Sequence, residues 1–159
     1  MRLWRITRKA FAKEPLRGEG GLYASARWHS APRLVVYASE SLALASLEVL
    51  VHVDPDLAPR DLVAIAIEVP SGVAVAQLTA ADLPRSWRRY PAPRSLQKRG
   101  DAWLDGRTGA VLAVPSVLVP NEHNYLLNPL HPDARHFTMV AKTPFAFDPR
   151  LLRAGRGEG

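Results

Sequence analysis

The chain has 159 residues, 47% of them hydrophobic and 23% charged, values that are ordinary for a soluble globular protein of one domain. It contains no cysteine, which excludes disulfides, thiolate metal sites and a cysteine nucleophile. The net charge of +6, from 21 basic and 15 acidic residues, favours an anionic partner such as nucleic acid, an acidic protein or a phosphorylated small molecule.

The first half of the chain is predicted to contain four strands and one helix. The helix runs from Glu40 to His52, and Ser39 is suited to cap its N-terminus. The strands are short, rich in β-branched residues and bounded by turn residues. They are Arg2–Thr7, Arg33–Ser39, Asp61–Pro70 and Gly72–Leu78, the last two separated by a turn.

Prolines punctuate the second half. Ala80–Asp105 has a helical pattern that prolines interrupt, and Gly109–Pro120 is strand-like, with Pro115 indicating a bulge or an edge position. The polar stretch 121–134 is predicted as an ordered loop, and 137–152 as the last strand or two. Short strands with few helices predict an α+β fold, in one domain over residues 1–152. The tail 153–159 is predicted to be disordered.

No segment has the character of a membrane anchor or a leader. No apolar run approaches the roughly 18 to 20 residues of a membrane span. The basic N-terminus lacks the apolar segment of a signal peptide. We therefore expect a cytoplasmic protein with no membrane partner.

The predicted helix carries one narrow polar seam. With Ser41 at zero on a helical wheel, Glu48 and His52 lie roughly 20° to either side. Apolar residues cover most of the remaining circumference, which predicts a helix buried on most sides, and Glu48 and His52 are within hydrogen-bonding reach. The wheel alone leaves two interpretations open. The seam is either a solvated edge or the wall of a pocket that uses a carboxylate, since a buried charge needs a partner.

Several other polar residues have both a structural and a functional interpretation. Arg27 is suited to clamp a phosphate with its planar guanidinium, or is an ordinary surface arginine. Tyr37, at the end of a predicted strand, is typical of a core residue. The stretch Ser116–His131 is typical of an Asx-rich loop, and its histidines His123 and His131 lack a zinc-motif spacing, so we expect no metal. No Rossmann or P-loop motif is present.

The segment Arg85–Gly100 supports an alternative function. It contains six basic residues, no acidic residue and two aromatic side chains, Trp87 and Tyr90. This pattern is compatible with a non-catalytic module that binds single-stranded nucleic acid. We favour a solvated basic face with both aromatic side chains in the core, and therefore no direct binding of nucleic acid.

Taken together, several blocks of the chain resemble the RES domain family from about Leu3 to Leu152. The blocks are GEG, RWHS, LVVYASESLALASLEVLVH, LQKRGDAWL and VPSVLVPNEHNYLLNPLHPDA, in the expected order. The resemblance implies that Arg27, Glu48 and Ser116 are the three residues after which the family is named. It further implies that these three residues are catalytic. Tyr37, Asn124 and Asn128 are expected to contribute to substrate binding, together with Arg27 and Ser116. We expect Ser41 and His52 to support Glu48.

The resemblance also implies a fold and an activity. The fold is similar to that of ADP-ribosyltransferases, with a small, strongly bent sheet flanked by helices. Members are toxins of bacterial toxin–antitoxin systems that consume NAD by phosphorolysis or hydrolysis of the nicotinamide–ribose bond, and some transfer ADP-ribose to a protein. NAD is the substrate, no further cofactor is expected, and the acceptor stays open. The expected partner is a helix-turn-helix antitoxin covering the active site, and a homodimer is a further expectation.

The chain departs from the family pattern beside Arg27. The family usually has two glycines before the Arg-Trp pair and an asparagine after it, where this chain has Ser25, Ala26 and His29. These changes are expected at the lip of the site and bear on the choice of acceptor.

Overall fold

One sheet organises the protein. The computed structural model describes residues 1–152, in which seven strands follow the order β4-β5-β6-β2-β1-β3-β7. Only β4 and β5 run parallel, and all other neighbours are antiparallel. The elements are β1 (Arg2–Arg8), β2 (Val36–Ser39), α1 (Leu42–Leu50), β3 (Leu62–Glu68), β4 (Val75–Gln77), α2 (Arg94–Gly106), β5 (Val111–Pro115), β6 (His123–Leu127) and β7 (Thr138–Phe145).

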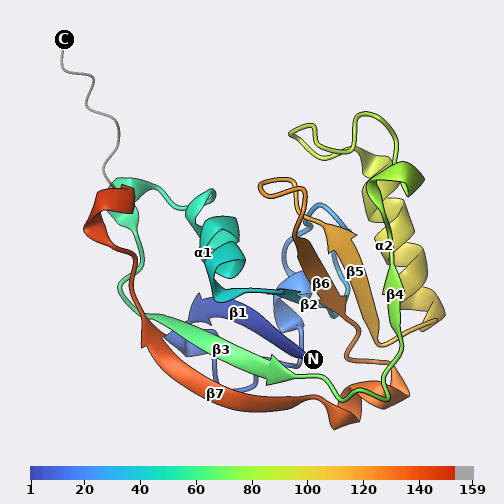
Figure 1. Ribbon diagram of the computed structural model, residues 1–159, viewed down its shortest axis with the longest axis horizontal. Coiled ribbons are helices and arrows are strands. Elements are labelled where there is room, and N and C mark those ends of the chain that lie inside the picture. Colours follow the sequence, from blue (N-terminus) through green and yellow to red (C-terminus); the bar gives the residue numbers. More distant parts are fainter. Residues whose placement is uncertain (153–159) are drawn as a thin grey trace.

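The sheet divides into two blocks between β1 and β2. β1 pairs with β3 along its whole length but meets β2 only where Trp4 pairs with Ser39. As a result, β1, β3 and β7 lie across the molecule while β4, β5 and β6 stand steeply to them (Figure 1). The predicted α+β class and the strongly bent sheet are thereby confirmed.

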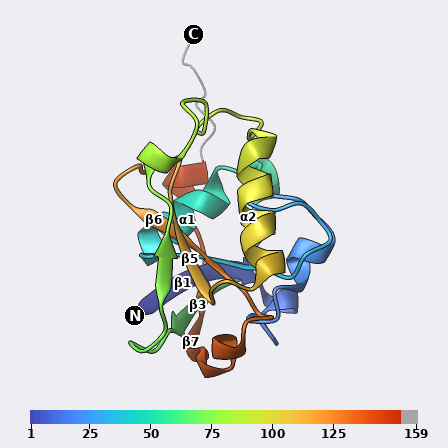
Figure 2. The ribbon, with the colours of Figure 1, turned by 90° about the vertical axis from the view of Figure 1, so that its right-hand side faces the viewer.

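Each helix is anchored to a different block. α1 buries Ala45 in a cluster with Ile6 of β1 and Leu62 of β3. α2 places Leu96, Trp103 and Leu104 in a second cluster, with apolar residues of β5 and β6, and stands alongside β5 (Figure 2). Burial of these apolar side chains is the main favourable contribution to the fold.

The helix after β2 is shorter than predicted. Its N-cap is Ser41, whose side chain accepts a hydrogen bond from the backbone N–H three residues on, whereas Ser39 belongs to β2. His52 lies beyond the C-cap residue. The expectation that the helix is buried on most sides was wrong, since Leu47 and Val51 are 41% and 55% exposed.

The polar stretch 121–134, predicted as a loop, contains the central strand β6. β6 pairs with β2 on one side and β5 on the other, so its backbone hydrogen bonds are made on both edges. Its polar side chains misled the prediction because Asn124 faces a cavity and not the apolar core. A strand that borders a site does not show the usual apolar alternation.

Further boundaries differ for identifiable reasons. β2 begins only at Val36, so the predicted strand from Arg33 was too long. Pro115 ends β5 with no bulge, beyond the last residue that pairs with β4. The interrupted helical segment 80–105 forms a regular helix only after Pro93, because proline disfavours helical backbone before it.

The strands predicted at 2–7, 61–70 and 72–78 and the final strand are confirmed. Within residues 1–152, neither helix is long and apolar enough to cross a bilayer. The tail 153–159, predicted to be disordered, lies outside the described residues.

Candidate active site

A cavity of about 900 Å³ opens where the two blocks of the sheet meet. This volume is near the upper end of the range for small-molecule and cofactor sites. Its walls come from β1, β2, α1, β6 and Gln97 of α2, and from three connecting stretches: 25–28, 88 with 90–92, and 115 with 117–118. Three arginines and one glutamate (Arg5, Arg27, Arg88 and Glu48) are the charged residues of its lining, with His52 at the same surface. The excess of positive charge suits an anionic ligand.

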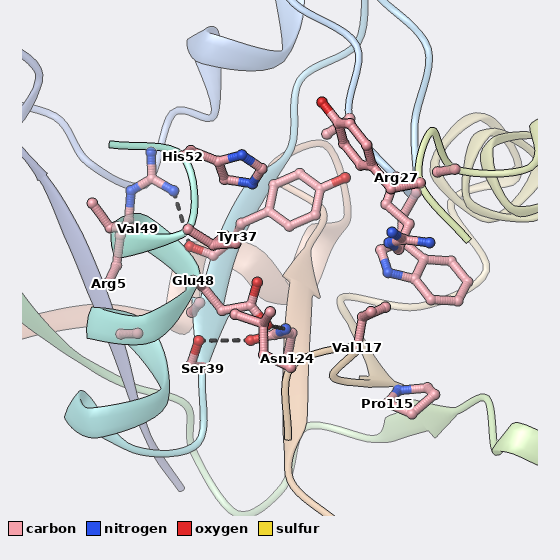
Figure 3. Close-up of a pocket in the computed structure, with 18 of the residues that line it drawn as sticks. Arg5, Arg27, Tyr37, Ser39, Glu48, Val49, His52, Pro115, Val117 and Asn124 are labelled. Atoms are coloured by element: carbon pink, nitrogen blue, oxygen red, sulfur yellow. Dashed lines mark hydrogen bonds between the residues drawn. The ribbon is translucent and has the colours of Figure 1, made fainter. Parts of the chain in front are cut away.

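Glu48 projects from α1 into this cavity with its carboxylate fixed (Figure 3). Its Oε1 accepts a hydrogen bond from Ser116 Oγ at 2.9 Å and a second from Asn124 Nδ2. No hydrogen bond among residues 1–152 reaches its other oxygen, Oε2, which points away from Asn124 in Figure 3. The carboxylate is therefore oriented by two neutral donors and keeps one oxygen for a ligand.

Ser116 supports Glu48 from behind and is fully buried. Its Oγ accepts hydrogen bonds from the backbone N–H groups of Leu118 and Val119, both at 3.1 Å. Because these donors occupy the oxygen lone pairs, the hydroxyl proton is directed at Glu48. Ser116 does not line the cavity, so its link to the cavity is its hydrogen bond to Glu48.

Asn124 is held by the neighbouring strand. Its Oδ1 accepts a hydrogen bond from Ser39 Oγ at 2.7 Å, and the two residues are register partners across β2 and β6. This contact fixes which end of the amide carries the NH2 group, and that group faces Glu48 (Figure 3). The adjacent strands β2 and β6 thus together orient the amide NH2 group of Asn124 toward the carboxylate of Glu48.

Tyr37 of β2 forms another wall of the cavity. Its hydroxyl lies 2.8 Å from His29 Nδ1, and its backbone carbonyl accepts a hydrogen bond from Arg5 Nη1 at 2.9 Å. Burial raises the pKa of Tyr37, so the phenol stays protonated. Burial lowers the pKa of Arg5, and none of the ion pairs within the described part of the chain includes this arginine.

The loop that carries Arg27 is fastened to α2. Gly100 makes the close approach possible, since a Cβ there would collide with the carbonyl oxygen of Trp28. Gln97 Nε2 donates to the carbonyl of Ala26 at 2.9 Å, and Asp101 accepts hydrogen bonds from the backbone N–H and hydroxyl of Ser30. The segment around residues 26–30 is thereby held rigidly opposite α1.

Arg27 enters the cavity from the side opposite α1 (Figure 3). Its guanidinium donates to the carbonyl of Trp87 at 2.6 Å and to that of Arg89 at 3.2 and 3.3 Å. Carbonyls do not neutralise its charge. Burial lowers the pKa of Arg27 and the charge of Glu48 raises it, so the two groups act on one another electrostatically.

The other three predicted site residues are not arranged as expected. Asn128 and Ser41 lie outside the cavity lining, and Ser41 and His52 lack the expected hydrogen bond to Glu48. Asn128 is buried, donates to the carbonyl of Leu104 at 3.0 Å and lies outside the lining. Ser41 caps α1 and donates to Glu122. His52 lines the cavity, but among the described residues it makes no hydrogen bond with Glu48, because α1 ends before it.

The basic segment 85–100 contributes to the cavity, and the expectation that both of its aromatic side chains lie in the core was wrong for one of them. Trp87 is buried as predicted, whereas Tyr90 is 85% exposed and lines the cavity. Arg88 also lines it and donates to the carbonyl of Val117. Arg5 was missed as well. Its only sequence signal is its position in β1 two residues from the buried Leu3, a spacing that places both side chains on one face.

The chain departs from the family pattern at residues 25, 26 and 29, and the structure places two of these in the cavity lining and the third behind it. Ser25 and Ala26 line the cavity, whereas His29 is buried behind Tyr37. No cluster of three or more metal-ligating side chains occurs among the residues that the structure describes.

The bent sheet, with Arg27 and Glu48 in one cavity and the buried Ser116 hydrogen-bonded to Glu48, is the arrangement of a known class of proteins. Residues 2–148 match the RES domain, and the chain belongs to this family. It is 44% identical over 155 residues to the "Toxin Res" of Pseudomonas putida, covering 96% of this chain and 100% of that protein. It is 38% identical over 154 residues to a "Prs ADP-ribosylating toxin" of a Sphingobium species, covering 94% of this chain and 96% of that protein.

A solved structure supports the fold independently. The crystal structure of the M. tuberculosis MbcT–MbcA toxin–antitoxin complex contains a chain that superposes with a TM-score of 0.72, covering 95% of this chain and 86% of that one. The sequence identity is 17%, so this likeness concerns the fold alone.

Proposed function

We propose that this protein is the toxin of a toxin–antitoxin system and that it cleaves the nicotinamide–ribose bond of NAD. The observation that carries the proposal is Glu48, a carboxylate held by Ser116 and Asn124 with one oxygen left for a ligand in an otherwise positive cavity. Family membership and the names of the relatives support the toxin role.

The proposed chemistry uses a fixed negative charge. Breaking the bond between the nicotinamide nitrogen and ribose C1′ sends the electron pair to the ring nitrogen, and nicotinamide leaves as a neutral molecule. Positive charge develops on C1′ and the ring oxygen, as in glycoside hydrolysis. Glu48 Oε2 stabilises that charge, since preorganised groups act strongly in a site with little water. An oxygen nucleophile then bonds to C1′ and loses its proton to Glu48 or to solvent.

The remaining residues bind and orient the dinucleotide. The pyrophosphate of NAD is anionic, and Arg27, Arg88 and Arg5 supply cationic groups along the cavity. The ring of Tyr37 forms a flat wall suited to the nicotinamide or the ribose. The leaving group already carries a positive charge, so the proposed reaction requires no helper cofactor.

A second candidate uses the same residues with a different acceptor. The Sphingobium relative is named an ADP-ribosylating toxin, at 38% identity over nearly the whole chain. In this alternative a nucleophilic side chain of a target protein attacks C1′ in place of phosphate or water. The bond that breaks and the role of Glu48 are unchanged.

One experiment separates the candidates. The purified protein is incubated with NAD labelled in its adenylate half, with and without inorganic phosphate, and with and without a cell extract. Free nicotinamide with a labelled product that depends on phosphate supports phosphorolysis, and release without phosphate supports hydrolysis. Label on protein only when extract is present supports transfer. Intact NAD in all arms would refute the proposal and favour a basic nucleic-acid-binding module.

We further propose an antitoxin with a helix-turn-helix domain that covers the mouth of the cavity. The structural neighbour comes from a toxin–antitoxin complex. Three exposed side chains with apolar surface, Tyr90, Val51 and Leu118, line the same cavity as the three arginines and offer contacts to a covering partner. Addition of the purified cognate antitoxin should abolish NAD cleavage. The homodimer stays a prediction, which light scattering of the purified protein tests.

A further inference from the structure

His29 is a buried residue for which the proposed mechanism has no role. Its side chain is 2% exposed, and both ring nitrogens have partners. Nε2 lies 3.0 Å from the carbonyl oxygen of Ala24, and Nδ1 lies 2.8 Å from the hydroxyl of Tyr37. The imidazole thus connects the loop before Arg27 to the aromatic wall of the cavity.

The two contacts fix the tautomer of His29. A carbonyl oxygen only accepts hydrogen bonds, so Nε2 carries the proton that points to Ala24. Burial lowers the pKa of His29, which keeps the ring neutral near neutral pH. In a neutral imidazole the other nitrogen, Nδ1, has a lone pair, so the hydroxyl of Tyr37 is the donor.

Tyr37 is therefore held at both ends. Its carbonyl accepts the hydrogen bond from Arg5, and its phenolic proton is directed at His29. With the proton directed there, the hydroxyl does not donate to a ligand, and the phenol oxygen becomes more electron-rich. An aromatic face in a fixed orientation attracts a cation lying over it.

We propose that His29 is a positioning residue that holds Tyr37 as a rigid, electron-rich wall for the cationic nicotinamide ring. This inference rests on the proposed NAD-cleaving function. It assigns a role to a residue at which the chain departs from the family pattern, and it predicts that the effect of His29 on the reaction passes entirely through the hydroxyl of Tyr37.

Substitutions at His29 are compatible with folding because the backbone around it has other anchors. Ala26 and His29 form an isolated β-bridge through their backbones. The carbonyl of Trp28 packs on Gly100, and Ser30 is bonded to Asp101. The loop is therefore tied to α2 on both sides of the imidazole, independently of its ring nitrogens.

Two amide substitutions separate the two contacts of the ring. The amide of His29→Asn reaches the position of Nδ1 and keeps an acceptor for Tyr37, whereas that of His29→Gln reaches the position of Nε2 and keeps a donor for Ala24. We expect His29→Gln to raise KM for NAD by about 3- to 10-fold, the effect of losing one neutral hydrogen bond. His29→Asn should lose distinctly less. The opposite order of the two variants would overturn the proposal.

A double-mutant cycle with Tyr37→Phe tests the path of the effect. Tyr37→Phe removes the hydroxyl, so it should raise KM about as much as His29→Gln, and the double variant should be no worse than either single variant. Additive losses would contradict the proposal. The parent should also lose kcat/KM at acidic pH, where a protonated His29 no longer accepts from Tyr37, and His29→Asn should lack this loss. Asp101 and Arg33 are the charged groups that act on His29, and both variants retain them.

Nitrogen NMR of the substrate-free protein gives a readout that does not depend on catalysis. Near neutral pH, His29 should carry its proton on Nε2, and the Nδ1 signal should shift in Tyr37→Phe. A proton on Nδ1, or an unchanged Nδ1 signal, would refute the hydrogen bond on which the inference depends. A protein that leaves NAD intact would instead refute the proposed function, whatever the nitrogen signals show.

Discussion

Replacing Glu48 by glutamine removes the charge of the site while leaving its geometry in place. The amide oxygen of the new side chain can still accept from Ser116 and from Asn124, the two donors that now hold Oε1. The amide NH2 then replaces Oε2, the oxygen that faces the cavity. Size, reach and supporting hydrogen bonds are kept, so a change in rate reports the negative charge itself.

The expected loss is large because the charge acts where positive charge develops. Removing a preorganised electrostatic group of this kind lowers turnover by roughly 10²-fold or more, which corresponds to about 2.7 kcal/mol of activation free energy. The melting temperature should change little or rise, since the carboxylate has only neutral donors and destabilisation at functional sites is common.

The assay is the initial rate of nicotinamide release per folded protein, together with thermal unfolding and toxicity on expression. Glu122→Gln is the matched control, because Glu122 accepts from Ser41 and lies outside the cavity lining. The control should match the parent, and Glu48→Gln should lose both NAD cleavage and toxicity. A folded Glu48→Gln protein that cleaves NAD at the parent rate would refute the reasoning.

Three further predictions concern buried residues outside the cavity lining. Ser116→Ala removes a donor to Glu48 and the acceptor of two buried N–H groups. It should lower both turnover and the free energy of unfolding, the latter by about 1–3 kcal/mol, and an unchanged turnover in folded protein would contradict its role. Asn128→Ala should destabilise by a similar amount through its bond to Leu104, while the folded protein keeps its KM for NAD, so a raised KM would place Asn128 at the substrate. Burial lowers the pKa of His29 below its ordinary 6.5, so the unfolded chain binds the proton more readily and the free energy of unfolding falls as pH drops below that value. Denaturant titrations of the parent and His29→Asn at about pH 7.5 and about pH 5 measure this, and equal losses in both proteins would contradict it.

The parts of the fold that follow from local pattern were predictable. β1 and β3 show the composition of strands, and the seam that singled out Glu48 follows from helical geometry over three turns of chain. β6 was not recognised because it begins with polar residues, and Asn124, which lines the cavity, is typical of a loop residue when its partners are unknown. The alternation of apolar and polar residues predicts a strand only where one face of the strand is buried in an apolar core. A strand that borders a polar cavity lacks this alternation.

The features that could not be predicted depend on contacts between segments that are far apart in the sequence. Arg27 is bonded to carbonyls some sixty residues away, at Trp87 and Arg89, and this approach depends on Gly100 admitting the backbone of Trp28. Nothing in the sequence near Arg27 indicates these partners. Arg5 lines the cavity next to Trp4–Ser39, the single pair by which β1 meets β2, and this arrangement is a property of the whole sheet.

The central claim is tested most directly by following free nicotinamide over time, with purified, antitoxin-free protein and excess NAD in phosphate buffer. The account predicts many molecules of nicotinamide released per molecule of protein, with equal consumption of NAD, and a rate that falls by roughly 10²-fold or more in Glu48→Gln. NAD that stays intact with folded, antitoxin-free protein would contradict it.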